Sequence, residues 1–281
     1  MTRPRQLPIA AARVGYQLFN IASRGDPAGR RVLAVEYLRL KAKQTLGRPG
    51  GPGRETILGM QLSYIEYGWL VHMFEEIFVD RHYDVPLENA APYIVDCGSN
   101  IGMSVLFFKR RFPAARVLAF EPEPQAFECL RANVEGNRLS DVEITHAAVT
   151  GRDGVAPFNF AAGSPISSVA AYRGLATTNA VRSVSLARRL DGPVDLLKLD
   201  VEGAEAAVLE DLAERGRLRS IRTIVLEYHH HLEADEDRLG ALLALLEQAG
   251  YGYQLQTRFR PPWSARTFQD VLVYAYRKDD V

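Results

Sequence analysis

From Pro92 onward, the chain alternates between two hydrophobic patterns. Short runs of β-branched and aromatic residues are followed by stretches in which apolar residues recur every three or four positions. The first pattern is typical of strands and the second of amphipathic helices. Strands joined by single helices form right-handed crossovers, which build a parallel sheet covered on both faces. The predicted strands are 93–96, 116–120, 142–149, 194–199 and 221–227, and the predicted helices are 103–112, 125–134, 205–214 and 237–249.

The last part of the chain breaks this alternation. Residues 251–257 and 271–276 both have strand-like patterns, and no helical pattern lies between them. Two such strands are expected to pair antiparallel at one edge of the sheet. The pattern therefore predicts an α/β core over residues 91–281, with a seven-stranded sheet that is mostly parallel and has a C-terminal antiparallel strand.

The first 90 residues do not show this alternation of strand and helix patterns. Val32, Val35 and Leu38 recur at helical spacing among cationic residues, which predicts an amphipathic helix with a cationic face. Glycine and proline interrupt regular structure over residues 47–54, so we interpret residues 1–54 as a helical arm with a linker. Bulky apolar residues at helical spacing between 69 and 78 predict a helical cover over 55–90, within one domain of residues 55–281.

Charge is divided unevenly between these parts. The chain has 34 Lys and Arg and 34 Asp and Glu, but residues 1–54 hold 11 of the basic residues and only two of the acidic ones. The balanced total argues against a protein that binds nucleic acid over its whole surface. We expect the basic arm to dock on the acidic body, either of the same chain or of the partner in a homodimer. Contact with an anionic substrate or a membrane surface is the alternative.

Composition sets the broad class of the protein. A hydrophobic content of 47% excludes intrinsic disorder, and two cysteines are too few for a disulfide scaffold, which favours a reducing compartment. No apolar run approaches the roughly 18 residues of a membrane-spanning helix. The apolar segment after the basic start is interrupted by Arg13, Gly15 and Gln17, which argues against a signal peptide. We therefore predict a cytoplasmic protein without a membrane anchor.

A glycine-containing loop lies directly between the first predicted strand of the core and its helix. In Val95-Asp-Cys-Gly-Ser-Asn-Ile-Gly102, Gly98 and Gly102 allow the backbone to turn tightly and approach a ligand. Glu121 ends the next strand, where an acidic residue can accept hydrogen bonds from both hydroxyls of a ribose. The two features together predict a nucleoside cofactor, with Ser99, Asn100 and Pro122 in the same loops.

The loop lacks the three glycines of a dinucleotide site. Asp96 opens it, and a carboxylate there repels a pyrophosphate and suits a cation. S-adenosylmethionine has a sulfonium, an ammonium and a ribose but no phosphate, so it fits this loop. We expect Asp96 to meet the methionine ammonium directly or through water; capping of the following helix is the alternative role. An NAD-dependent oxidoreductase is the alternative enzyme class.

Polar residues also end the fourth and fifth strands of the core. Asp200 is expected to point into the cleft or to cap the next helix. Glu227 and His229 share one face of the following strand because strand side chains alternate. His229, with an ordinary pKa of about 6.5, suits a general base. Alternatively, Asp200, Glu227 and His229 together could hold a divalent ion such as Mg²⁺, which would lower the pKa of an acceptor hydroxyl.

Three further residues complete the predicted site. Lys198 lies in an otherwise apolar strand, and we expect it to pair with Glu202 or Glu205 because an unpaired buried ammonium is costly. Ala147 is small enough to leave room for an adenine ring. Ser168, in the serine-containing loop that follows, is expected to face the cofactor or the acceptor.

Four segments resemble motifs of the FkbM family of S-adenosylmethionine-dependent methyltransferases, in the family's order and spacing. They are Ile94–Gly102, Phe120–Pro124, Lys198–Glu205 and Leu226–His229, and the likeness covers about residues 60–275. The resemblance implies a class I methyltransferase fold, which is Rossmann-like, and methyl transfer to an oxygen, often a hydroxyl of a sugar or secondary metabolite. A cofactor-binding regulatory protein without turnover is the alternative. The basic arm is not part of the resemblance.

Overall fold

A seven-stranded sheet forms the centre of the protein. The computed structural model describes residues 6–23, 27–47, 50–160, 167–168, 177–230, 238–257 and 269–280. The strands of the central sheet are β3 (Tyr93–Cys97), β4 (Arg116–Glu121), β5 (Val142–His146), β10 (Val194–Leu199), β11 (Ile221–His230), β12 (Tyr251–Thr257) and β13 (Gln269–Arg277). Their order is β12-β13-β11-β10-β3-β4-β5, with β13 antiparallel to both of its neighbours and the strands from β11 to β5 parallel. The predicted α/β fold and its terminal antiparallel element are confirmed.

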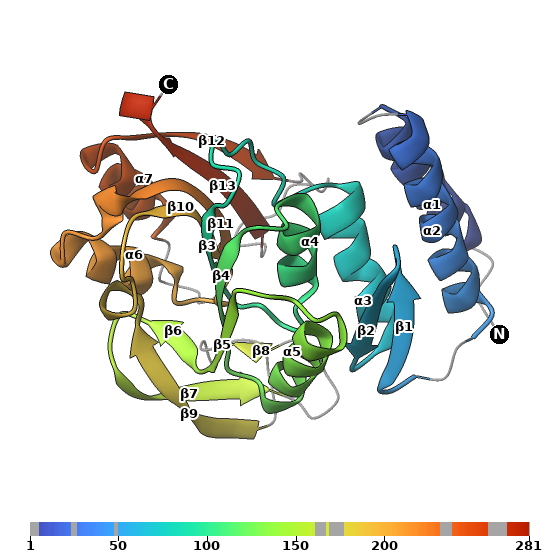
Figure 1. Ribbon diagram of the computed structural model, residues 1–281, viewed down its shortest axis with the longest axis horizontal. Helices are drawn as coiled ribbons and strands as arrows, with labels where there is room; N and C mark the ends of the chain where they lie inside the picture. The colour runs from blue at the N-terminus through green and yellow to red at the C-terminus, as the bar shows by residue number, and fades with distance from the viewer. Residues whose placement is uncertain are drawn as a thin grey trace.

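Helices cover both faces of this sheet (Figure 1). They are α4 (Met103–Arg111) and α5 (Pro124–Gly136) on one face and α6 (Glu205–Glu214) and α7 (Leu239–Gln248) on the other. Successive residues of β3 alternate between the two hydrophobic clusters, with Ile94 in the first and Val95 in the second. Both faces of the parallel strands are therefore buried, which leaves the carboxyl edge of the sheet as the place for a ligand.

The segment expected to form one strand over residues 142–149 forms two. β5 ends at His146, and the amide of Ala147 donates to the carbonyl of Thr145 at 3.0 Å, which closes a tight turn. After the turn, the chain enters a second sheet with the order β6-β9-β7-β8. Its strands are β6 (Ala148–Thr150), β7 (Gly154–Phe160), β8 (Ser167–Ser168) and β9 (Thr177–Ser185).

A β-hairpin replaces part of the expected linker and helical cover. β1 (Gly53–Ile57) pairs antiparallel with β2 (Met60–Tyr64), and the turn between them places Leu58 and Gly59 at positive φ. Alternate residues of both strands are buried, which is the period of a strand and not of a helix. Asn133 of α5 anchors the hairpin by bonding the amide and the carbonyl of Ser63 at 2.6 and 3.0 Å. The helix α3 (Tyr67–Phe74) and the π-helix η1 (Glu75–Val79) follow, as the apolar spacing predicts.

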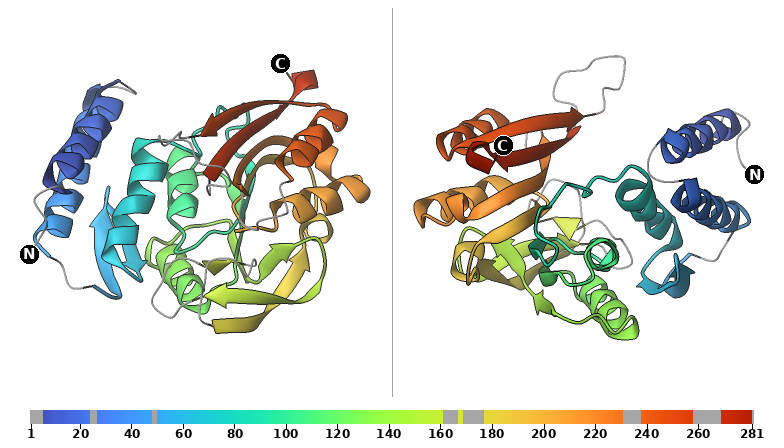
Figure 2. Two further views of the ribbon diagram at one scale, coloured as in Figure 1. Left: turned by 180° about the vertical axis from the view of Figure 1, so that it is seen from behind. Right: turned by 45° about the horizontal axis from the view of Figure 1, so that its top comes forward.

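The N-terminal arm is a pair of helices, α1 (Gln6–Ser23) and α2 (Pro27–Thr45), which lie beyond α3 and the hairpin (Figure 2). Their cations reach acidic residues of the same chain. Glu75 is 3.2 Å from Lys41 and 2.6 Å from Arg13, and Glu55 is 2.9 Å from both Arg39 and Lys43. The basic arm thus docks on its own acidic body. In the part of the chain that the structure describes, no helix combines the length and apolar character needed to cross a bilayer.

The stripe of Val32, Val35 and Leu38 does not face this body. All three side chains are exposed, whereas Tyr37 and Leu40 of the same helix are fully buried. The segment is a helix, but it is not amphipathic as predicted, because apolar residues lie on its exposed side as well as on its buried side. The side that holds it to the protein combines two large apolar residues with the cations.

Glu75 should be central to this docking because it is buried and meets two cations of the arm. We expect Glu75→Gln to lower the free energy of unfolding by about 1–2 kcal/mol, since an amide cannot balance Arg13 and Lys41. Urea denaturation measures this change. In the exposed pair of Glu128 and Arg131, Glu128→Gln should change it by less than about 0.5 kcal/mol. Equally small losses in the two variants would show that Glu75 does not hold the arm.

Candidate active site

Two adjoining cavities lie at the carboxyl edge of the central sheet. We call the first the Glu121 cavity; its residues are Gly98, Asn100, Glu121, Pro122, Ala148, Val149, Phe158, Asp200, Val201 and Glu202. We call the second the His229 cleft; its residues are Trp69, His72, Met73, Glu76, Ile77, Tyr83, Gly98, Ser99, Asn100, Met103, Ser104, Lys198, Asp200, Glu202, Glu227, His229 and Asp270. Gly98, Asn100, Asp200 and Glu202 belong to both. The two spaces therefore meet at the ends of β3 and β10.

Lys198 lies beneath this meeting point. Its ammonium is 2.7 Å from the carbonyl oxygen of Gly98, 3.3 Å from Asp96 Oδ1 and 3.4 Å from Asp200 Oδ2. Burial lowers the pKa of Lys198, but the charges of Asp96 and Asp200 outweigh it and raise the pKa above its usual value. The lysine therefore stays charged. The expected pairing with Glu202 or Glu205 is wrong, because those residues lie beyond the strand and turn toward His229.

Gly98 has a conformation and a position that only glycine tolerates. Its φ is +81°, and a Cβ built there would lie 1.8 Å from the carbonyl oxygen of Asp200. The amide of Asp200 donates to the carbonyl of Cys97 at 3.1 Å, so β10 ends in contact with the glycine loop. This close approach explains why the loop after β3 and the end of β10 form one continuous wall.

Glu121 is positioned by the same loop. Its carboxylate accepts hydrogen bonds from the amides of Asn100 at 2.7 Å and Glu123 at 2.8 Å, and its side chain is almost fully buried. Burial outweighs these two bonds and raises the pKa of Glu121 to about 8. The predicted cofactor residues Gly98, Asn100, Glu121 and Pro122 thus meet in one cavity, and Ser99 lines the adjoining cleft.

Asp96 does not reach the cleft. It is fully buried, and its carboxylate accepts a hydrogen bond from Ser104 Oγ at 2.6 Å and pairs with Lys198. It therefore supports the loop from below. The alternative role as a helix cap is wrong, because Gly102 is the N-cap of α4 and no side chain caps it.

Two other predicted cofactor residues, Gly102 and Ala147, lie outside both cavities, and the structure does not test a third, Ser168. Gly102 packs against α5, where a Cβ would lie 2.6 Å from Leu130 Cδ1, and it is not part of either cavity. Ala147 is buried in the turn after β5, and its neighbours Ala148 and Val149 line the Glu121 cavity instead. Ser168 belongs to β8, and the prediction for its side chain falls outside the described part of the structure.

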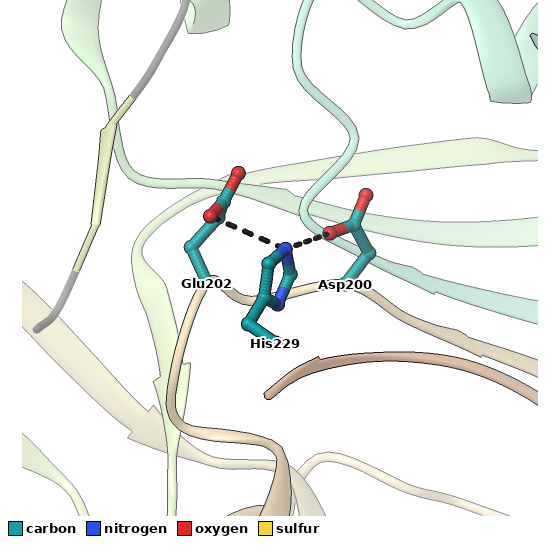
Figure 3. Close-up of side chains that lie close together, drawn as sticks. All are labelled: Asp200, Glu202 and His229. Atoms are coloured by element: carbon teal, nitrogen blue, oxygen red, sulfur yellow. Dashed lines mark ion pairs between the residues drawn. The ribbon is translucent and has the colours of Figure 1, made fainter. Parts of the chain in front are cut away.

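His229 is surrounded by carboxylates (Figure 3). Its Nδ1 is 2.9 Å from Glu205 Oε1, and its Nε2 is 3.3 Å from Glu202 Oε2 and 3.8 Å from Asp200 Oδ1. Burial lowers the pKa of His229, but Glu202, Glu205 and Glu227 outweigh it and raise the pKa well above its usual value. The surrounding carboxylates therefore favour the imidazolium form of the ring. The expectation of an ordinary pKa near 6.5 is wrong, because burial places the ring among three acids.

Glu227 lies on the same face of β11 as His229, as the strand alternation predicts, and both line the His229 cleft. Burial and the nearby charge of Asp200 raise the pKa of Glu227 well above its usual value. Among the described residues, the groups close enough to share one ion are Asp200 with Glu202 and His229, and Glu227 with His229 and Asp270. The predicted trio of Asp200, Glu227 and His229 is not one of these groups, since Glu202 takes the place of Glu227.

One wall of the His229 cleft was not predicted from the sequence. Trp69, His72, Met73 and Glu76 line it from α3 and η1. Their spacing of three or four residues does place them on one helix face. We interpreted that face as packing on the core, because the pattern does not distinguish a buried surface from the wall of a cavity.

Sequence comparisons with known proteins show which family the chain belongs to. The family described as "Methyltransferase FkbM domain" matches residues 96–253. Methyltransferase sdnD of Sordaria araneosa is 30% identical over 262 residues, which cover 80% of this chain and 97% of the relative. The 31-O-demethyl-FK506 methyltransferase FkbM of Streptomyces tacrolimicus is 30% identical over 231 residues, covering 69% and 86%. A crystal structure of Methyltransferase FkbM from Methylobacillus flagellatus KT has 14% identity and a TM-score of 0.48, and covers 94% of this chain and 59% of that one.

The raised pKa of Glu121 allows a pH test of its predicted role in binding the ribose. A ribose hydroxyl would donate to the ionised carboxylate, so binding below pH 8 would first have to remove a proton. We expect the affinity for S-adenosylhomocysteine to fall by up to about tenfold per pH unit below 8, and Glu121→Gln to remove this dependence and weaken binding at pH 8 by about 10- to 100-fold.

Calorimetry across pH 6–9 measures both effects, and Glu143→Gln on the neighbouring strand β5 is the matched control. An unchanged affinity in Glu121→Gln would remove Glu121 from the cofactor site.

Proposed function

The chain belongs to the FkbM family of S-adenosylmethionine-dependent methyltransferases, and we propose that it methylates a hydroxyl oxygen of a small molecule, of the sugar or natural-product class. The observation that carries this proposal is the junction of the two cavities at Asp200 and Glu202. A donor with its ribose on Glu121 and an acceptor in the His229 cleft would meet there.

Charge supports an uncharged acceptor. The His229 cleft is lined by the carboxyl groups of Glu76, Asp200, Glu202, Glu227 and Asp270. Such a surface repels phosphate groups, so it disfavours nucleic acid and phosphorylated acceptors. Carboxyl groups also bond well to alcohols. A relative is named a 31-O-demethyl-FK506 methyltransferase, a name that describes methylation of an oxygen.

The acceptor must lose its hydroxyl proton as the new C–O bond forms. S-adenosylmethionine, when bound, supplies a methyl group whose bond to sulfur breaks as the oxygen attacks. We assign the proton to Asp200, which is partly exposed at the junction and lies between the positive charges of Lys198 and His229. We assign His229 to holding the carboxylates of Asp200 and Glu202 in place, and not to the role of base, because its raised pKa favours the protonated ring. Glu227 is placed to bond the acceptor from the next strand.

A divalent ion is the alternative way to activate the hydroxyl. Asp200, Glu202 and His229 Nε2 converge, and Glu205 orients the ring through Nδ1, as carboxylates do for metal-bound histidines. One nitrogen and two carboxylates suit Mn²⁺ better than Mg²⁺, which prefers oxygen ligands. When no ion is bound, the neighbouring carboxylates favour a proton on His229, so a proton and an ion would compete for Nε2. Because only two carboxylates and one nitrogen converge here, fewer oxygen ligands than a hard ion prefers, we propose catalysis without a metal.

Removal of the Asp200 carboxylate should affect the chemical step. With an acceptor identified by S-adenosylhomocysteine release from a panel of glycosides and hydroxylated natural products, Asp200→Asn should lower kcat by about 10²- to 10⁴-fold while cofactor affinity changes by less than about tenfold. Asp191→Asn, at an exposed site outside both cavities, should leave kcat unchanged. Full activity of Asp200→Asn would place the chemistry elsewhere, and a product methylated on nitrogen or carbon would reject the O-methyltransferase.

Metal removal separates the two ways of activating the hydroxyl. We expect kcat to stay within about twofold after dialysis against EDTA, because the cluster offers fewer oxygen ligands than a hard divalent ion prefers. Turnover before and after dialysis, and after addition of Mn²⁺ or Mg²⁺, measures this. Loss of activity that Mn²⁺ restores in the native enzyme, but not in His229→Asn, would place an ion between Asp200, Glu202 and His229.

A further inference from the structure

The arm presents an apolar surface to solvent. On α1, Tyr16 and Phe19 are 58% and 69% exposed; on α2, Val32, Val35 and Leu38 are 53%, 67% and 45% exposed. Each set recurs every three residues and so forms one stripe along its helix. We call these five residues the outer face of the arm. The two helices are in contact, and large exposed apolar surfaces on soluble proteins mark contact sites.

The opposite side of the arm fixes this orientation. Gln17 and Asn20 of α1 are buried, and their amides donate to the Asp80 carboxylate at 3.1 Å each. On α2, the pairs of Arg39 and Lys43 with Glu55 face the body. A rotation that buried the outer face would break all of these contacts. The apolar stripes are therefore held outward by the side of the arm that docks.

Charge argues against a membrane as the occupant. A helix that lies on an anionic membrane carries several cations beside its apolar stripe. Among the exposed residues that the structure describes in α1 and α2, only Arg13 and Arg31 are charged, and Arg13 pairs with Glu75. A second identical apolar surface requires no opposite charge.

The size of the surface also fits a second copy. Helices of 18 and 19 residues are about 27 Å long, and two packed side by side cover about 20 Å in width. The face then measures roughly 500 Å², so two copies would bury about 1,000 Å², at the lower limit of specific interfaces. We propose that the outer face of the arm is a self-association surface, on which a second copy docks by a two-fold axis to form a four-helix contact.

The mass of the full chain in solution tests this proposal. Sedimentation equilibrium over roughly 1–100 µM should show a concentration-dependent rise from 31.3 kDa toward twice that mass. Val35→Glu should weaken the dimer at least about tenfold, because it buries a charge at each copy of the face. Val155→Glu, an equally exposed valine on β7, is the matched control and should leave the dimer intact.

Two further measurements complete the test. Thermal unfolding of Val35→Glu at low concentration should match that of the native chain, which shows that the variant folds. Flotation with phosphatidylcholine and phosphatidylglycerol vesicles should leave the protein behind. A mass of 31.3 kDa at every concentration, a dimer insensitive to Val35→Glu, or vesicle binding by a monomer that Val35→Glu abolishes would each overturn the proposal.

Discussion

The buried ammonium of Lys198 ties together the parts of the chain from which the active site is built. It contacts the carbonyl of Gly98 and the carboxylates of Asp96 and Asp200, so the loop after β3 and the end of β10 keep a fixed spacing. Without it, Asp96 would be a buried charge with no cation beside it, which typically costs several kcal/mol. Gly98 allows the backbones of the same two segments to approach closely, because any Cβ there would collide with the carbonyl oxygen of Asp200.

A second group of opposite charges, formed by His229 and the carboxyl groups around it, determines the chemistry of the cleft next to Lys198. His229 is a cation among Asp200, Glu202 and Glu205, and Glu227 faces the same cleft. The carboxyl groups outnumber the cations, which favours a sulfonium and disfavours a phosphate. The acids that favour a cationic donor also favour the protonated form of His229, which is why we propose Asp200 and not His229 as the base.

Features that depend on residues close together in the sequence could be predicted from it. Alternating strands and helices predicted the central sheet, and Gly98 and Glu121 were placed because both follow predicted strands directly. Pairings across the fold were not predictable: Lys198 meets Asp96 and Asp200 because β10 lies beside β3, and no spacing along the chain contains that register. The hairpin at Gly53–Tyr64 and the turn at Ala147 were missed because each depends on a few residues. The exposure of Val35 could not be predicted, because helical spacing shows that apolar residues share one side of a helix but not whether another part of the protein covers that side.

The central claim is that donor and acceptor meet where the two cavities share Asp200 and Glu202. A crystal structure of the protein with bound S-adenosylhomocysteine tests it most directly. We expect both ribose hydroxyls to donate to the Glu121 carboxylate, and the sulfur to point to the junction of the two cavities beside Asp200. A ribose bound away from Glu121, or a sulfur facing away from the His229 cleft, would contradict it.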